Sequence, residues 1–271
     1  MEQQQFSLTL SNKFSTDIFP NNTCSNFSIQ FTNPIKLNAD DWEVGLADII
    51  FPSQVYTLTN DDWIQITRCN DDDDDDGGDD NGNGVSKTLI VDNPIKFDSI
   101  ERLVDYMNGK MNSEISPSQC QFIYNTDLNE FSIDLKIGAK MIWSKSMMDI
   151  FGYLNQHFEG KGYLHHAPLG LPLLNRGINH LYIYSSISEF IHVGDTKAPL
   201  LRIVPFVMQQ QSVANKNYQH FEFKHIIYAN VTPSTISTIN IKIRDGAGEI
   251  IPFIDVEQQG IQIILHFRRR R

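Results

Sequence analysis

Histidine and cysteine are the side chains of this sequence best suited to chemistry, and the histidines form no catalytic arrangement. His165 and His166 are adjacent, so in a strand their rings point to opposite faces and cannot hold one metal ion together. His192 stands three residues before Asp195, but no nucleophile pattern accompanies this pair. We therefore expect structural roles for these histidines.

The cysteines raise a cysteine protease as an alternative, which their surroundings disfavour. Such an enzyme needs a thiolate activated by a base. Cys24 lies in a polar turn, Cys69 beside an acidic run that disfavours a thiolate, and Cys120 at the start of a strand. No CxxC pair, GxSxG, HExxH or Gly-rich phosphate loop occurs. The sequence thus predicts no catalytic residue, no metal site and no cofactor, in a protein that is not an enzyme.

Two segments of the chain are strongly charged. The basic one, Arg268–Arg271, could contact the phosphates of nucleic acid without base specificity, dock on an acidic neighbouring subunit, or only solvate the chain end. The acidic one, within residues 69–84, holds eight aspartates between Asp71 and Asp80 and contributes most of the net charge of −11. Like-charge repulsion favours a flexible loop here, and the ligand spacing of a calcium loop is absent.

The composition is that of a folded, strand-rich protein. The 271 residues are 41% hydrophobic and 11% aromatic, with 17 phenylalanines, and aromatic side chains favour strands. No segment reaches 18 apolar residues, and the first residues lack the pattern of a signal peptide. We expect a protein made in the cell interior, not secreted, with no membrane partner.

Alternating apolar and polar residues predict strands in both terminal parts of the chain. In Phe6–Leu10 the apolar residues recur at every second position. In Trp42–Pro52 both faces are mostly apolar, and Val44, Leu46 and Asp48 are expected on one face. The other predicted strands are residues 27–31, 63–68, 181–184, 199–207, 221–228, 236–243 and 261–267.

The middle of the chain predicts a small α+β unit. Asp98 and Glu101 match a capping box at the start of a helix with one apolar face. Residues 122–124 and 131–135 flank a polar turn and predict a hairpin, and Ser146 is expected to cap a short second helix. The apolar face of the first helix comprises Ile100, Leu103, Val104, Met107 and Met111.

The predicted fold class is mainly β, a single jelly-roll sandwich interrupted by a small α+β insertion. A set of about eight long strands, split by a long insertion, suits two sheets packed face to face. Strand number alone does not separate a jelly roll from another Greek-key sandwich. The expected domains are a discontinuous sandwich of residues 1–68 and 178–271, the acidic loop at 69–84, and the insertion at 85–160.

Five segments, taken in order, resemble the minor capsid (penton) proteins of Polinton (Maverick) elements and of related eukaryotic DNA viruses and virophages. They span nearly the whole chain, and the ordered set is more specific than any single motif. The segments are Phe6–Leu10, Phe19–Phe27, Trp42–Pro52, His192–Pro205 and Leu265–Arg270. The aspartate run is a departure from this family.

The resemblance implies a structural capsid subunit without catalytic activity. It implies a single jelly roll that assembles as a homopentamer at the vertices of an icosahedral virion. Its partner there would be the double-jelly-roll major capsid protein of the same element. That major capsid protein is itself a poor fit to this sequence, because 271 residues cannot hold two jelly rolls with their loops.

Two residues of these motifs are candidate subunit contacts, beside the C-terminal arginines. Arg202 is the one charge in an apolar run, so it should be paired within the subunit or across a boundary, or else point to solvent from an edge strand. Around it, Leu200, Ile203 and Val204 are expected to enter the core. Trp42 fits either a core anchor or an interface hot spot.

A jelly-roll binding module for glycans or receptors, derived from a capsid protein, is the alternative function. The aromatic-rich residues 163–184 would then form the recognition surface. Binding without assembly distinguishes such a module from a capsid subunit, which should form rings.

Overall fold

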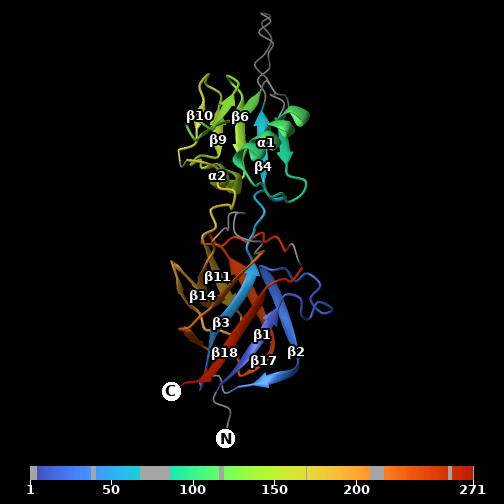
Figure 1. The fold of residues 1–271 in the computed structure, drawn as a ribbon, viewed down its shortest axis with the longest axis vertical. Coiled ribbons are helices and arrows are strands. Elements are labelled where there is room, and N and C mark those ends of the chain that lie inside the picture. Colours follow the sequence, from blue (N-terminus) through green and yellow to red (C-terminus); the bar gives the residue numbers. More distant parts are fainter. Residues whose placement is uncertain are drawn as a thin grey trace, which may run out of the picture. The chain divides into compact units, whose positions relative to one another are not determined.

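The chain folds into two compact units, one built from both terminal parts of the sequence and one from its middle. The computed structural model describes residues 5–37, 41–67, 86–115, 119–168, 170–207, 217–255 and 258–270. The first unit comprises Met1–Val55 and Ile178–Arg271, and the second comprises Tyr56–Gly177 (Figure 1). The predicted acidic loop at 69–84, Cys69 included, lies outside the described residues.

Two antiparallel sheets make up the first unit. One has the strand order β1-β18-β3-β15, with β16 also paired to β3, and the other has the order β14-β11-β17-β2. β12 and β13 form a separate hairpin. The strands are β1 (Gln5–Ser11), β2 (Asn26–Lys36), β3 (Trp42–Pro52), β11 (His180–Ser185), β12 (Ile191–Val193), β13 (Thr196–Ala198), β14 (Leu200–Pro205), β15 (Tyr218–Glu222), β16 (Tyr228–Asn230), β17 (Thr235–Arg244) and β18 (Gln262–Arg269).

The strand pairing is that of a jelly roll. Apart from the short β16, the strands of the two sheets are, in chain order, β1, β2, β3, β11, β14, β15, β17 and β18. The first pairs with the last, the second with the seventh, the third with the sixth and the fourth with the fifth. One long antiparallel ribbon rolled into a sandwich gives this order. The predicted fold class is therefore confirmed, and the second unit is inserted between β3 and β11.

β3 has the predicted bounds Trp42–Pro52, but a bulge changes which side chains face the core. Neighbouring residues of β18 pair with Asp48 and with Leu46, so Ala47 is an extra residue in β3. Val44 and Leu46 face the core as expected. Asp48 lies on the outer face instead of sharing theirs, which corrects the prediction, because the extra residue reverses the alternation of the strand.

Apolar side chains from both sheets fill the space between them. β3 and β18 contribute from one sheet, and β11 and β17 from the other. The fully buried members include Val44, Phe267, Ile183 and Ile241. Full burial of each such side chain contributes about 1.5–3 kcal/mol, so the shared core holds the two sheets face to face.

The second unit has a core of its own, formed by two sheets and two helices. One sheet has the order β5-β4-β8-β9 and the other the order β10-β7-β6. The largest fully buried side chains of this core include Trp143, Phe122 and Phe151. The elements are β4 (Trp63–Thr67), β5 (Ser86–Ile90), α1 (Ile100–Glu114), β6 (Cys120–Asn125), β7 (Glu130–Leu135), β8 (Lys140–Trp143), α2 (Lys145–Phe151), β9 (His157–Glu159) and β10 (His165–His166).

Both helices form where the sequence predicts them, but their caps differ from the expected ones. The N-cap of α1 is Ser99, whose hydroxyl accepts from the backbone N of Arg102 (3.4 Å), and not Asp98. The N-cap of α2 is Ser144 rather than Ser146. In each case the cap directly precedes the helix, where its oxygen reaches the N–H three residues later. Among the described residues, no helix combines the length and apolar character needed to cross a membrane.

One strand that the sequence analysis counts with the sandwich lies in the second unit. β4 pairs with β5 on one side and β8 on the other, both within the second unit. The alternation of residues 63–67 identifies a strand with one buried face, but alternation does not say against which sheet that face packs. The assignment of this strand to the sandwich is therefore wrong.

A buried carboxylate joins both ends of the second unit to α2. The side chain of Asp62 is fully buried and accepts hydrogen bonds from Thr59 N (2.7 Å), Arg176 Nη1 (2.8 Å) and Ser146 Oγ. Arg176 Nη1 also donates to Thr57 O at 3.1 Å. The Asp62 carboxylate thus connects three parts of the unit: its first segment, its last segment and the first turn of α2.

Candidate functional site

The predicted C-terminal arginines lie at the end of β18, and their side chains alternate between its two faces. Arg268 lies on the outer face, where its Nε donates to Glu43 Oε2 (3.0 Å) and its Cζ lies 3.6 Å from the centre of the Tyr228 ring. Arg270 Nε is 3.9 Å from the other carboxylate oxygen of Glu43. One carboxylate therefore partly neutralises two of these arginines. Arg271 lies outside the described residues.

Arg269 and Trp42 meet on the inner face at the same end of the sheet. The guanidinium of Arg269 lies 5.9 Å from the Trp42 ring. Trp42 is only 7% exposed, and its ring lies 5.4 Å from Phe6, which in turn stacks on Phe267 at 4.6 Å. Within the subunit, Trp42 is therefore packed into the sandwich core, and only a small part of its surface is exposed to solvent.

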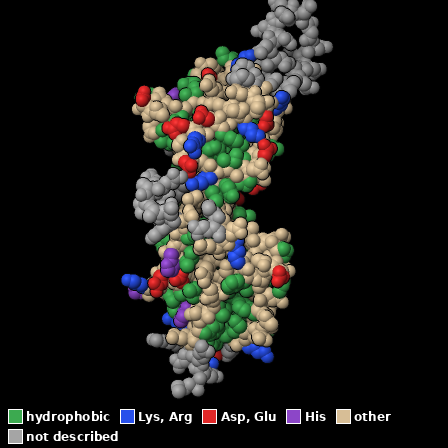
Figure 2. All heavy atoms as spheres, turned by 45° about the vertical axis from the view of Figure 1, so that its right-hand side comes forward, with side chains coloured by type: hydrophobic (Ala, Val, Ile, Leu, Met, Phe, Trp, Pro, Cys, Tyr) green, Lys and Arg blue, Asp and Glu red, His purple; other side chains and the backbone are tan. Residues whose placement is uncertain are grey.

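The outer face of the same sheet carries two histidines with polar partners. His266 Nδ1 lies 3.0 Å from the hydroxyl of Tyr228, and His220 Nε2 lies 2.8 Å from Asp48 Oδ2. The second contact depends on the bulge at Ala47, because the bulge turns Asp48 outward. Figure 2 shows histidine and acidic side chains side by side on the surface of this unit. The histidines on this outer face are therefore each in contact with a polar side chain of the same sheet.

Gly45 allows the chain to pass closely over β3 and thereby positions Tyr228. The segment that links β15 to β16 crosses at this point, since both strands pair with β3. A Cβ on Gly45 would lie 2.4 Å from the carbonyl oxygen of Ile227 and 2.4 Å from Ile226 Cγ2. Only glycine fits such an approach, and the approach brings the ring of Tyr228 to Arg268.

Arg202 is engaged within the subunit. It lies on the edge strand β14 directly opposite Ile183, whose side chain is fully buried, so Arg202 projects from the core-facing side of the strand. Its Cζ lies 4.1 Å from the Phe223 ring centre, and Nη1 donates to His225 O (2.9 Å). Burial lowers the pKa of Arg202. The side chain thus links the edge of one sheet to the segment that follows β15 in the other.

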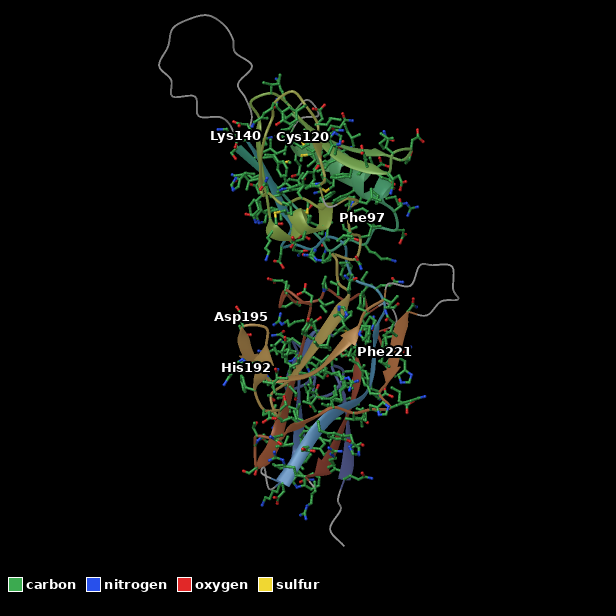
Figure 3. All side chains as sticks on the ribbon, turned by 90° about the vertical axis from the view of Figure 1, so that its left-hand side faces the viewer. Phe97, Cys120, Lys140, His192, Asp195 and Phe221 are labelled. Atoms are coloured by element: carbon green, nitrogen blue, oxygen red, sulfur yellow. The ribbon has the colours of Figure 1, made fainter. Side chains whose placement is uncertain are left out.

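The rest of the motif around Arg202 forms the β12–β13 hairpin and β14. Asp195 lies in the turn of the hairpin (Figure 3). Leu200 and Val204 are buried, but Ile203 is 43% exposed, so its expected place in the core is wrong. The reason is that Arg202 and Val204 stand opposite the buried Ile183 and Leu181, so Ile203 between them faces outward.

The described cysteines lack the properties of catalytic nucleophiles. Burial raises the pKa of Cys24 to about 11 and that of Cys120 to about 12. Both therefore remain neutral thiols near neutral pH, whereas a nucleophilic cysteine needs a lowered pKa. No cluster of three or more metal-ligating side chains occurs in the part of the chain that the structure describes. The protease alternative thus lacks its thiolate at both positions.

The sequence itself matches no protein-family model and no curated protein. The chain is similar to a penton protein. This solved structure is the crystal structure of the mavirus penton protein, with 12% identity and a TM-score of 0.44 over 99% of this chain and 100% of that chain. A chain of the cryo-EM structure of the Sputnik virophage is similar at 9% identity and a TM-score of 0.42, over 99% of this chain and 98% of that chain. The fold assignment rests on the strand pairing and not on these likenesses.

No sequence pattern identifies Glu43 and Tyr228 as the partners of Arg268. Glu43 and Tyr228 reach Arg268 only through the register of β3 with β18 and β16. Alternation does place Glu43 and Arg268 on the non-core faces of their strands. The pairing register that brings them together, however, depends on a bulge that alternation cannot reveal.

Proposed function

We propose that this protein is a minor capsid subunit of the Polinton (Maverick) type, which forms homopentameric vertices of an icosahedral virion. Its partners are further copies of itself and the double-jelly-roll major capsid protein of the same element, and it catalyses no reaction. A closed ring of five needs heterologous contacts, in which one surface of each subunit meets a different surface of the next.

The convergence of the family-like segments in space carries this proposal. Phe6–Leu10, Trp42–Pro52 and Leu265–Arg270 are far apart in sequence, yet they lie in the adjacent strands β1, β3 and β18 of one sheet. His192–Pro205 supplies the hairpin and the edge strand of the other sheet. A fold alone does not determine function, but motifs that meet in one sheet fit a shared structural framework better than chance matches do.

The candidate contacts fall at two places on the sandwich. Arg202 lies on the edge strand β14, and an edge strand presents backbone donors and acceptors to a neighbour. Arg268 and Arg270, with Arg269 and Trp42 beneath them, lie at one end of the other sheet. Arg268 and Arg270 share the one carboxylate of Glu43, so this cluster favours an acidic surface of the next subunit or packaged DNA.

The mass of the purified protein in solution tests the proposal. Light scattering at low and at moderate salt should give a mass near five times 31.0 kDa, or ring-shaped particles. Arg202→Ala should weaken the assembly, with Arg202→Lys as the matched control that keeps the charge. A strict monomer that stays monomeric after co-expression with the major capsid protein would count against the vertex role.

Nucleic-acid contact by the C-terminal arginines has a test of its own. Each neutralised phosphate should add about −0.9 to the slope of log K against log salt for duplex DNA. Replacing Arg268, Arg270 and Arg271 by serine should flatten that slope, and an unchanged slope would exclude contact with DNA phosphates by these residues.

The alternative function, a binding module for glycans or receptors, draws support from one observation in the second unit. A groove there brings basic and aromatic side chains together, as described below. A vertex subunit and a binding module are compatible on one chain, because the groove and the jelly roll belong to different units.

A further inference from the structure

An open groove in the second unit is lined by basic, imidazole and aromatic side chains. Its volume is about 570 Å³, within the range of ~300–1,000 Å³ typical of small-ligand sites. β8 and β9 supply one wall, and residues 161–165 supply the other. The groove lies within the unit and not in the jelly roll, so the vertex proposal does not use it.

The pairing of β8 with β9 fixes which side chains project into the groove. Lys140 stands directly opposite Glu159, and His157 lies two positions from Glu159 along β9, so all three side chains lie on the same face of the sheet. Figure 3 labels Lys140 on β8. The chain then passes Gly160, where a Cβ would lie 1.7 Å from the carbonyl oxygen of Lys136. Because residue 160 is glycine, the chain can pass close to Lys136 between β9 and residues 161–165, which form the second wall.

The second wall presents an aromatic ring to solvent. Tyr163 is 56% exposed, and its ring centre lies 5.5 Å from that of His165. His165 is held in place because its ring meets Phe158 edge-on at 5.4 Å and its Nε2 donates to Glu159 O at 3.0 Å. A fixed imidazole thus supports a phenol ring whose outer surface remains open to the groove.

The described residues that line the groove carry a net positive charge. Lys140 and Lys161 are both exposed, and none of the ion pairs among the described residues uses either ammonium group. Of the described lining residues, Glu159 alone contributes a carboxylate. Two ammonium groups against one carboxylate favour a ligand that carries negative charge.

We propose that this groove binds a saccharide that carries a carboxylate, such as a sialylated glycan. The C–H face of a sugar ring packs on an exposed aromatic ring, which Tyr163 supplies. Sugar hydroxyls both donate and accept hydrogen bonds, as Asn155 and His157 can in return. The carboxylate pairs with Lys140 or Lys161. A peptide or nucleotide phosphate would use the lysines but would gain less from a ring at the rim.

The test measures binding of 3′-sialyllactose and of lactose to the full chain. Saturation-transfer NMR detects the binding, and a titration gives its affinity. 3′-Sialyllactose should bind saturably, and lactose should bind about tenfold more weakly because it lacks the sialic acid residue that carries the carboxylate. Tyr163→Ala and Lys140→Ala should each weaken binding of 3′-sialyllactose by about tenfold. Lys145→Ala, an exposed lysine of the same unit that does not line the groove, should bind as the unchanged protein does.

Two results would overturn the proposal. One is no saturable binding of 3′-sialyllactose by the unchanged protein. The other is binding that Tyr163→Ala and Lys140→Ala leave intact. Both side chains are exposed, so unchanged unfolding midpoints should show that each variant is folded. The outcome is independent of ring formation, because light scattering measures assembly separately.

Discussion

Removal of the Asp62 carboxylate should strongly destabilise the second unit. Asp62→Ala deletes the acceptor of hydrogen bonds from Thr59, Ser146 and Arg176. The Asp62 side chain is 0% exposed and that of Arg176 is 17% exposed, so water cannot fully solvate the guanidinium that remains. Breaking a buried pair by removing one partner costs about 3–5 kcal/mol. The loss should lie toward the upper value, because two neutral donors also lose their acceptor.

Backbone hydrogen exchange is the assay, because one sample reports on both units. Amides of β4 and β8 should exchange with an opening free energy lower by about 3–5 kcal/mol in Asp62→Ala. Amides of β3 and β18 belong to the other core and serve as the internal reference. The double variant Asp62→Leu with Arg176→Met should recover most of the loss, since it leaves no buried charge.

An exposed ion pair of the same unit provides the matched control. Lys110 Nζ lies 2.6 Å from Asp92 Oδ2, but the Asp92 side chain is 71% exposed. Asp92→Ala should therefore cost less than about 1 kcal/mol. If Asp62→Ala costs no more than Asp92→Ala, burial does not control the strength of the Asp62 network, and the reasoning is refuted.

Three further substitutions test local features. Gly45→Ala should lower the free energy of unfolding by at least about 1–3 kcal/mol, because the added Cβ would clash with the carbonyl of Ile227. The loss should appear as a lower urea midpoint of the sandwich, and an unchanged midpoint would contradict the close approach. Ser99→Ala should lower the stability of the second unit by about 1 kcal/mol, and Asp98→Ala should lower it less, because Ser99 is the N-cap of α1. The reverse order would mean that Asp98 is the cap, as the sequence predicts. Arg202→Ala should speed exchange of amides in the segment after β15 and cost about 0.5–1 kcal/mol, and equal exchange would mean that its contacts with that segment are not stabilising.

Regular alternation made the sandwich strands predictable, and a departure from alternation accounts for one error within them. Trp42–Pro52 forms one strand with the predicted bounds. Asp48 takes an unexpected face because it follows an extra residue in its strand, whereas Ile203 faces outward because its neighbour Val204 faces the core. A bulge depends on the register of the neighbouring strand, which is distant in sequence, so no local pattern announces it.

Local patterns also located the helices but not every detail of the site. The apolar face of α1 is buried at Leu103, Val104, Met107 and Met111, as its spacing predicts. The arginine cluster was visible as a run of one residue type. Its engagement with Glu43 and Tyr228, and the groove beside Tyr163, arise from tertiary pairing and therefore could not be read from sequence.

Because β1 pairs with β18, the sandwich cannot close until β18 has left the ribosome. The inserted unit is complete in sequence long before that, and its core needs only its own strands and helices. In the interval, β1 and β3 both lack the strand that lies between them in the finished sheet. Two hydrogen-bonding edges are then open to pairing with other chains. Biosynthesis, more than the folded state, is therefore the stage at which this protein is most exposed to aggregation.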